Sequence, residues 1–128
     1  MTREEIRREI EARAMPVLER IARDHLDLLE AVQFLNHFGL YAPGGNALVR
    51  AVTLEGGGLA LRFSSNGGPY GAVADVELTP EGARLTSVSG GDEDADRLPE
   101  RMTRWAKEML AWLEQMARAD QEEMRGRA

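Results

Sequence analysis

Apolar positions in the N-terminal part of the chain recur every three or four residues, which predicts an amphipathic helix. The stripe consists of Ile6, Ile10, Ala14, Val17, Ile21, Leu28, Val32 and Leu35. Thr2 and Glu5 form a capping-box pattern at its start. Pro16 lacks a backbone N–H, so we expect a kink or a break near Met15. Over 26–38 the apolar positions cover most of the circumference, which is typical of a helix buried on more than one side.

The middle of the chain changes to a period of two, which predicts β-strands. The segments, separated by glycine-containing turns, are 47–55, 59–65, 72–78 and 83–90. In the first we expect Leu48, Val52 and Leu54 on one face, with Arg50 interrupting them. The inward sets of the next two are Leu59, Leu61 and Phe63, and then Ala72, Ala74, Val76 and Leu78. The turn at 79–82 has the proline and glycine positions of a type I turn. These features predict an antiparallel meander with one apolar face.

The C-terminal part returns to helical spacing and contains both tryptophans of the chain. Six large apolar residues alternate at steps of four and three, as in a heptad seam: Leu98, Met102, Trp105, Met109, Trp112 and Met116. Three uses of this seam stay open: packing within the domain, a dimer interface, or a surface for a client protein.

The predicted fold is therefore α+β. It has a long N-terminal helix kinked near Pro16, a four-stranded antiparallel meander and a long C-terminal amphipathic helix. We expect one domain over 1–120 and a frayed tail over 121–128.

The helical segments carry more apolar surface than so small a sheet can cover. A four-stranded sheet with one apolar face covers roughly two helices. The broad apolar face of 26–38 and the seam of 98–116 exceed that capacity. Large exposed apolar patches mark interaction sites. We therefore expect a homodimer joined through its helices, a complex with another protein, or both.

Composition narrows the classes of function. The chain has 128 residues and a formal net charge of −6, spread evenly, so binding to a nucleic-acid backbone is not expected. No apolar run reaches the roughly 20 residues of a membrane span. The charged N-terminal segment is unlike a signal peptide, which favours a cytoplasmic protein. Cysteine is absent, which excludes disulfides and thiolate chemistry.

No residue pattern predicts a catalytic, cofactor or metal site. His25 and His37 lie about 120° apart around one helix and cannot share a metal. The acidic stretch 92–96 opens like a calcium loop. However, Arg97 and Thr103 stand where such a loop requires glycine and glutamate. We therefore expect no metal and no cofactor.

The leading hypothesis is a non-enzymatic protein–protein interaction module of the adaptor, chaperone or inhibitor type. Its size, acidity and amphipathic C-terminal helix make it similar in general class to bacterial secretion chaperones. Four consecutive strands do not match their pattern, in which a helix interrupts the strands.

Two alternatives stay open. One is a small-molecule-binding or enzymatic domain with a pocket between the first helix and the sheet. The pocket would be lined by His25, Phe34, Phe38, Tyr41 and Phe63. Asp75 and Glu77 form a candidate acid–base pair, although we expect them on the solvated face of their strand. The other alternative is an acidic inhibitor that mimics nucleic acid, which only the net charge supports.

Overall fold

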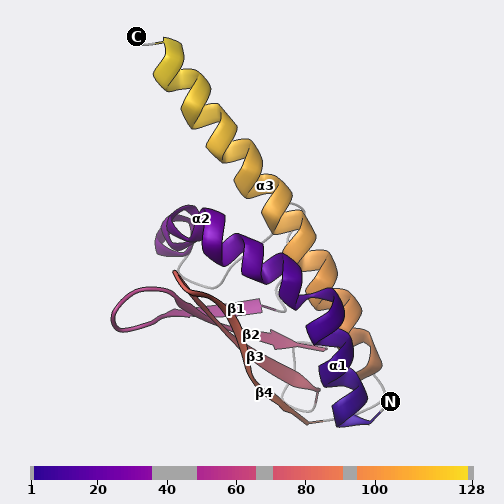
Figure 1. Ribbon diagram of the computed structural model, residues 1–128. Helices are drawn as coiled ribbons and strands as arrows, with labels where there is room; N and C mark the ends of the chain where they lie inside the picture. The colour runs from indigo at the N-terminus through magenta and orange to yellow at the C-terminus, as the bar shows by residue number, and fades with distance from the viewer. Residues whose placement is uncertain (1, 36–48, 66–70, 91–94, 127–128) are drawn as a thin grey trace.

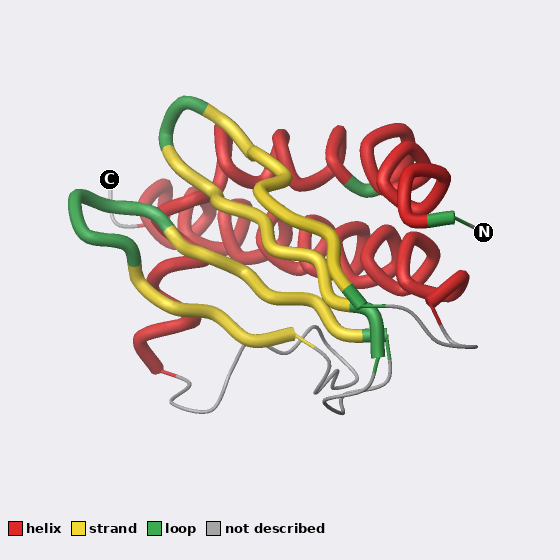
Figure 2. The backbone as a smooth tube through the Cα atoms, turned by 90° about the horizontal axis from the view of Figure 1, so that it is seen from below, coloured by secondary structure: helices red, strands yellow, loops and turns green. Residues whose placement is uncertain are grey.

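The computed structural model describes residues 2–35, 49–65, 71–90 and 95–126. Its elements are α1 (Arg3–Arg13), α2 (Met15–Leu35), β1 (Val49–Thr53), β2 (Leu59–Ser64), β3 (Val73–Thr79), β4 (Gly82–Ser89), the 3-10 turn η1 (Ala95–Arg97) and α3 (Leu98–Gly126). The strands form one antiparallel sheet in the order β1-β2-β3-β4. The three helices lie on one side of it (Figure 1, Figure 2). The α+β class, the meander and the long C-terminal helix are confirmed.

The N-terminal helical segment is divided into α1 and α2 at Ala14. Thr2 caps α1 as expected: its hydroxyl accepts a hydrogen bond from the Glu5 N–H at 3.2 Å, and the Glu5 carboxylate accepts one from the Thr2 N–H at 3.3 Å. Pro16 is the second residue of α2, within the first turn, where a missing N–H removes no helical hydrogen bond. Within α2 a kink occurs at His25, whose φ of −138° and ψ of 19° are not helical.

The two central strands have the predicted faces. The inward sets of β2 and β3, which begin at Leu59 and Ala72, are all buried. In the β3–β4 turn, Pro80 and Glu81 have negative φ, because the described residues with positive φ are all glycines. Negative φ at both positions excludes I′ and II′ turns and agrees with the type I turn.

The predicted face of β1 is wrong. Val49 pairs with Phe63 and Ala51 with Leu61, so the odd-numbered residues of β1 face the core. Val52 instead points outward and is 66% exposed. Because side chains alternate along a strand, a shift of one residue exchanges the two faces. Arg50 could have shown the correct face from the sequence. A charged residue in one alternating set of a strand favours burial of the other set. Leu54 follows the end of the strand, and Leu48 lies outside the described residues.

A β-bulge in the β3–β4 ladder shifts the register of β4. Ala74 pairs with Val88, whereas Val76 pairs with Leu85, so β4 has one residue more than β3 between these pairs. Without that extra residue, Leu85 and Val88 would point to opposite faces. The bulge lets both contribute to the same side of the sheet, Val88 as a buried residue and Leu85 as a half-buried one.

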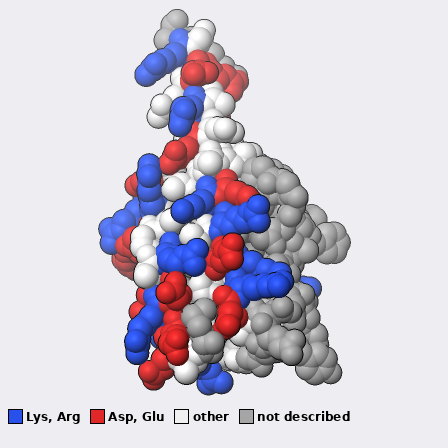
Figure 3. Space-filling model, turned by 90° about the vertical axis from the view of Figure 1, so that its right-hand side faces the viewer, with Lys and Arg blue, Asp and Glu red and all other residues white. Residues whose placement is uncertain are grey.

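Two carboxylates of α2 hold the hairpin turns at one end of the sheet. Glu19 accepts a hydrogen bond from the Ala83 N–H at 2.6 Å, at the start of β4. Glu30 accepts one from the Gly58 N–H at 3.1 Å, in the β1–β2 turn. These contacts fix α2 across the sheet. By contrast, the end of α3 projects beyond both α2 and the sheet (Figure 1, Figure 3).

Candidate protein interface

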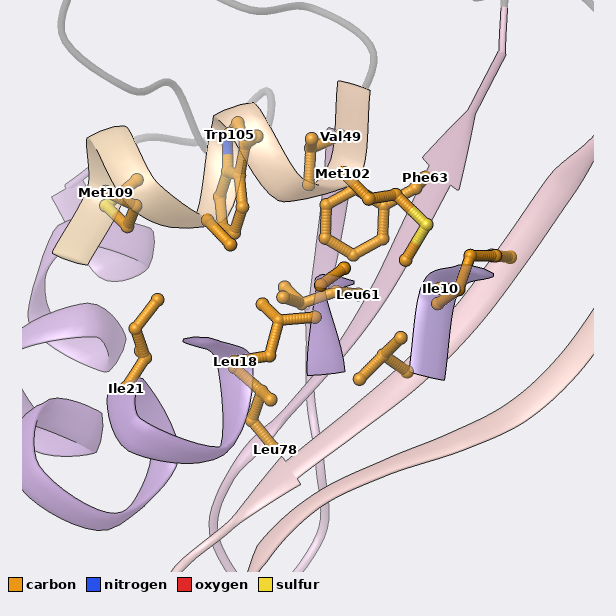
Figure 4. Packing of buried hydrophobic residues seen from close by; sticks show 14 of the residues in the cluster. Ile10, Leu18, Ile21, Val49, Leu61, Phe63, Leu78, Met102, Trp105 and Met109 are labelled. Atoms are coloured by element: carbon orange, nitrogen blue, oxygen red, sulfur yellow. The ribbon is translucent and has the colours of Figure 1, made fainter. Parts of the chain in front are cut away.

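The first four seam residues belong to the chain's own core. Leu98, Met102, Trp105 and Met109 are 0% exposed and pack with residues of the sheet and of α1 and α2. In Figure 4 the ring of Trp105 extends from α3 toward the sheet. It meets Phe63 edge to face, with ring centroids 5.3 Å apart and an interplanar angle of 77°. Of the three uses left open, packing within the domain therefore describes these four residues.

The last two seam residues lie at the edge of the core. Trp112 and Met116 are only half-buried, whereas Leu113, outside the seam, is 0% exposed. A straight α-helix drifts by about 20° per heptad relative to a strict seven-residue repeat. Two heptads after Leu98, this drift has brought Leu113 to the core side and moved Trp112 to the flank. A helix period of 3.6 residues, in place of the 3.5 of a strict heptad, would have predicted from the sequence that Leu113 faces the core.

The part of α3 beyond the body has a side that continues the core-facing stripe. Met116, Asp120 and Met124 follow one another at intervals of four residues and so lie on one side of the helix. All residues from 118 to 126 are exposed, and Met124 is 72% exposed. The tail is helical as far as Gly126. Its fraying from residue 121 stays a prediction.

Charges on the helices are intermixed rather than grouped by sign. Blue and red side chains alternate over the face in Figure 3, including the projecting end of α3. Arg20 on α2 forms an ion pair with Glu114 on α3 at 2.9 Å, which joins the two helices where α3 leaves the body. A nucleic-acid mimic would need a continuous acidic array. This face does not present one.

Of the residues of the alternative pocket, the structure describes the side chains of two, His25 and Phe63. His25 is half-exposed and borders a hollow of about 380 Å³ between α2 and α3, which Glu114 also lines. Phe63 instead lies in the core against Trp105. The side chain of Phe34, and the residues Phe38 and Tyr41, lie outside the description. The structure therefore separates the two described members of the set, His25 and Phe63.

Asp75 and Glu77 lie on the outer face of the sheet, as predicted, and both are in ion pairs. Arg62 donates to both carboxylate oxygens of Asp75, at 2.8 and 3.2 Å, and the Ser87 hydroxyl donates to Oδ2 at 2.8 Å. These hydrogen bonds, that of Arg62 above all, hold the pKa of Asp75 below its ordinary value. Glu77 pairs with Arg84 at 2.9 Å. A carboxylate with a lowered pKa is a weak general base, so the pair is ill-suited to acid–base catalysis.

The outer face also has a shallow hollow that the sequence did not predict. Its volume is about 450 Å³, and it runs from Arg50 and Val52 on β1 past Ala60 on β2 to the carboxylates of β3. Val52 and Met124 are the large apolar side chains that are well exposed in the described part of the chain. The correct register of β1 would have placed Val52 on this face.

Neither a metal site nor a membrane span is found among the described residues. Groups of three or more potential metal ligands do not occur in them. The calcium-like stretch lies largely outside this part, because 91–94 are not described. Nor does any described helix combine the length and the apolar character needed to cross a bilayer.

No protein-family model, curated protein or solved structure matches the chain.

Proposed function

We propose that this chain is a non-enzymatic protein–protein interaction module that binds through the projecting end of α3, with a second copy of itself as one partner. The observation that carries the proposal is the continuation of the core-facing side of α3 past the body. Met116 and Met124 lie on that side, and Met124 is 72% exposed. An adaptor, a chaperone or an inhibitor would use such a surface.

The projecting end is poorly supported within one chain. From Arg118 to Gly126, where every residue is exposed, it has a length of about 14 Å at 1.5 Å per residue. Isolated helices shorter than about 12–15 residues are marginal in water, and most helical stability in proteins comes from tertiary packing. A partner that covered Met116 and Met124 would supply that packing. Trp112, partly buried one turn before Met116, is of the residue type enriched at interaction hot spots.

The described side chains favour binding over catalysis. Asp75 and Glu77 are held in ion pairs on the outer face, whereas His25 belongs to α2, which lies against the other face of the sheet. No observation on the described residues favours the small-molecule pocket, and the intermixed charges do not favour a nucleic-acid mimic. A cytoplasmic location stays a prediction.

Sedimentation equilibrium at tens of micromolar tests the proposal. We expect the wild-type chain to self-associate and Met124→Asp to weaken that association at least tenfold, because a charge would be buried at the contact. Gln115→Asp is the matched control, since it adds the same charge at an exposed position on another side of α3. At a concentration where the wild type is monomeric, both variants should keep its melting temperature. A monomeric wild type, or equal effects of the two variants, would contradict the proposal.

A further inference from the structure

The outer face of the sheet carries two cross-strand rows of side chains. One row runs Arg50, Arg62, Asp75 and Ser87, and the other runs Val52, Ala60, Glu77 and Arg84. On β3 and β4 the charges in these rows are neutralised, because Asp75 pairs with Arg62 and Glu77 with Arg84. The β1 end of the face therefore differs from the rest, because Arg50 lies there beside the exposed apolar side chain of Val52.

Arg50 lies in an unfavourable position for an isolated chain. It is directly opposite Arg62 on the neighbouring strand. Like charges in directly opposite positions destabilise a sheet. Arg62 is compensated by Asp75, whereas no carboxylate among the described residues forms an ion pair with Arg50. An acidic group from outside the chain would remove this repulsion and complete the row.

The projecting end of α3 has the complementary arrangement. Asp120 lies between Met116 and Met124, one helical turn from each, and no described basic residue forms an ion pair with it. Side chains four residues apart on a helix have Cβ atoms about 6 Å apart. Arg50 and Val52, two residues apart on a strand, are separated by about 7 Å. The two spacings are similar, so Asp120 and Met124 on the helix can face Arg50 and Val52 on the strand at the same time.

We propose that the end of α3 in one copy packs on the outer face of the sheet of a second copy, with Asp120 against Arg50 and Met124 on Val52 and Ala60. This inference rests on the proposed function and names the surface that α3 binds. The contact is between copies because α3 lies on the helix side of its own sheet in both ribbon views (Figure 1, Figure 2). The contact joins two different surfaces, the end of α3 in one copy and the sheet of the other. It therefore either forms a closed dimer, in which each copy supplies both surfaces, or continues as an open chain of copies.

Charge reversal tests the pairing. Arg50→Asp and Asp120→Arg should each weaken self-association about tenfold or more in sedimentation equilibrium, as measured couplings between close charges at interfaces indicate. An equal mixture of the two variants should associate nearly as well as the wild type, because each variant supplies the charge that the other needs. Arg8→Asp, which reverses an exposed arginine on α1, is the control and should have little effect.

The possible failures are distinguishable. Both positions are exposed, so the variants should fold, and melting temperatures no lower than that of the wild-type monomer check this. If Met124→Asp weakens association but Arg50→Asp does not, α3 binds elsewhere, and the inference falls while the proposed function stands. The same holds if each single reversal weakens association and the mixture does not restore it. If the wild type is monomeric, both fall.

Discussion

The two tryptophans of α3 should respond differently to truncation, because only one of them is fully buried. Trp105 is 0% exposed and contacts Phe63 edge to face. An aromatic side chain of this size buries about 200 Å², which at about 25 cal/mol per Å² sets an upper limit of about 5 kcal/mol. Trp105→Ala should therefore lower the free energy of unfolding by about 3–5 kcal/mol. Trp112 is only partly buried at the edge of the core, so Trp112→Ala should cost less than Trp105→Ala.

Trp105→Phe separates packing from polarity at the same position. The indole Nε1 of Trp105 is buried and has no hydrogen-bond partner among the described residues. Leaving such a donor unsatisfied costs about 1–3 kcal/mol, which the phenylalanine variant would regain. Trp105→Phe should thus be much milder than Trp105→Ala.

Urea unfolding followed by far-UV circular dichroism measures these differences without relying on tryptophan fluorescence. Equal losses for Trp105→Ala and Trp112→Ala would refute the assignment of Trp105 to the core and Trp112 to its edge. A loss for Trp105→Phe as large as that for Trp105→Ala would refute the cost assigned to the unbonded indole N–H.

Three further predictions concern charge, backbone and metal. Because the folded protein lowers the pKa of Asp75, its ionised form adds stability that is complete above about pH 4 and is lost as the pH falls through the folded value. Asp75→Asn should therefore lower the urea midpoint at neutral pH and progressively less in acid, and a pH-independent difference would contradict this. Gly82→Ala would place a Cβ 2.5 Å from Oε1 of Glu19 at a φ of +139°, whereas Gly57→Ala, at a φ of +104°, would meet nothing within 4 Å. Gly82→Ala should lower the urea midpoint more than Gly57→Ala, and equal shifts would show that the Glu19 contact is unimportant. A chelator should leave the melting temperature unchanged, and a fall of several degrees would reveal a metal.

Much of the fold could be predicted because local patterns and packing agree. The four strands follow the change of period, and the capping residues of α1 identify its start. The face of β1 could not be decided by counting apolar residues, since Val52 is apolar and yet exposed. The bulge in β4 and the kink at His25 were not predicted, because no proline or glycine in the sequence marks either position.

The candidate interface was predicted only in part. The heptad seam identified α3 as the amphipathic helix, but a seam alone does not show where the body of the protein ends. That boundary assigns Met109 to the core and leaves Met124 exposed. The role proposed for Arg50 likewise depends on its cross-strand neighbour, which becomes known only with the register of β1 and β2.

Hydrogen exchange in the wild-type chain tests the central claim most directly, because it reports on the end of α3 without any substitution. The amides of 118–126 belong to exposed helical turns in the isolated chain. If this end binds a second copy, those amides should exchange markedly more slowly at about 100 µM than at about 1 µM, since mass action shifts the chain into the complex. Equally fast exchange of these amides at both concentrations would contradict the account.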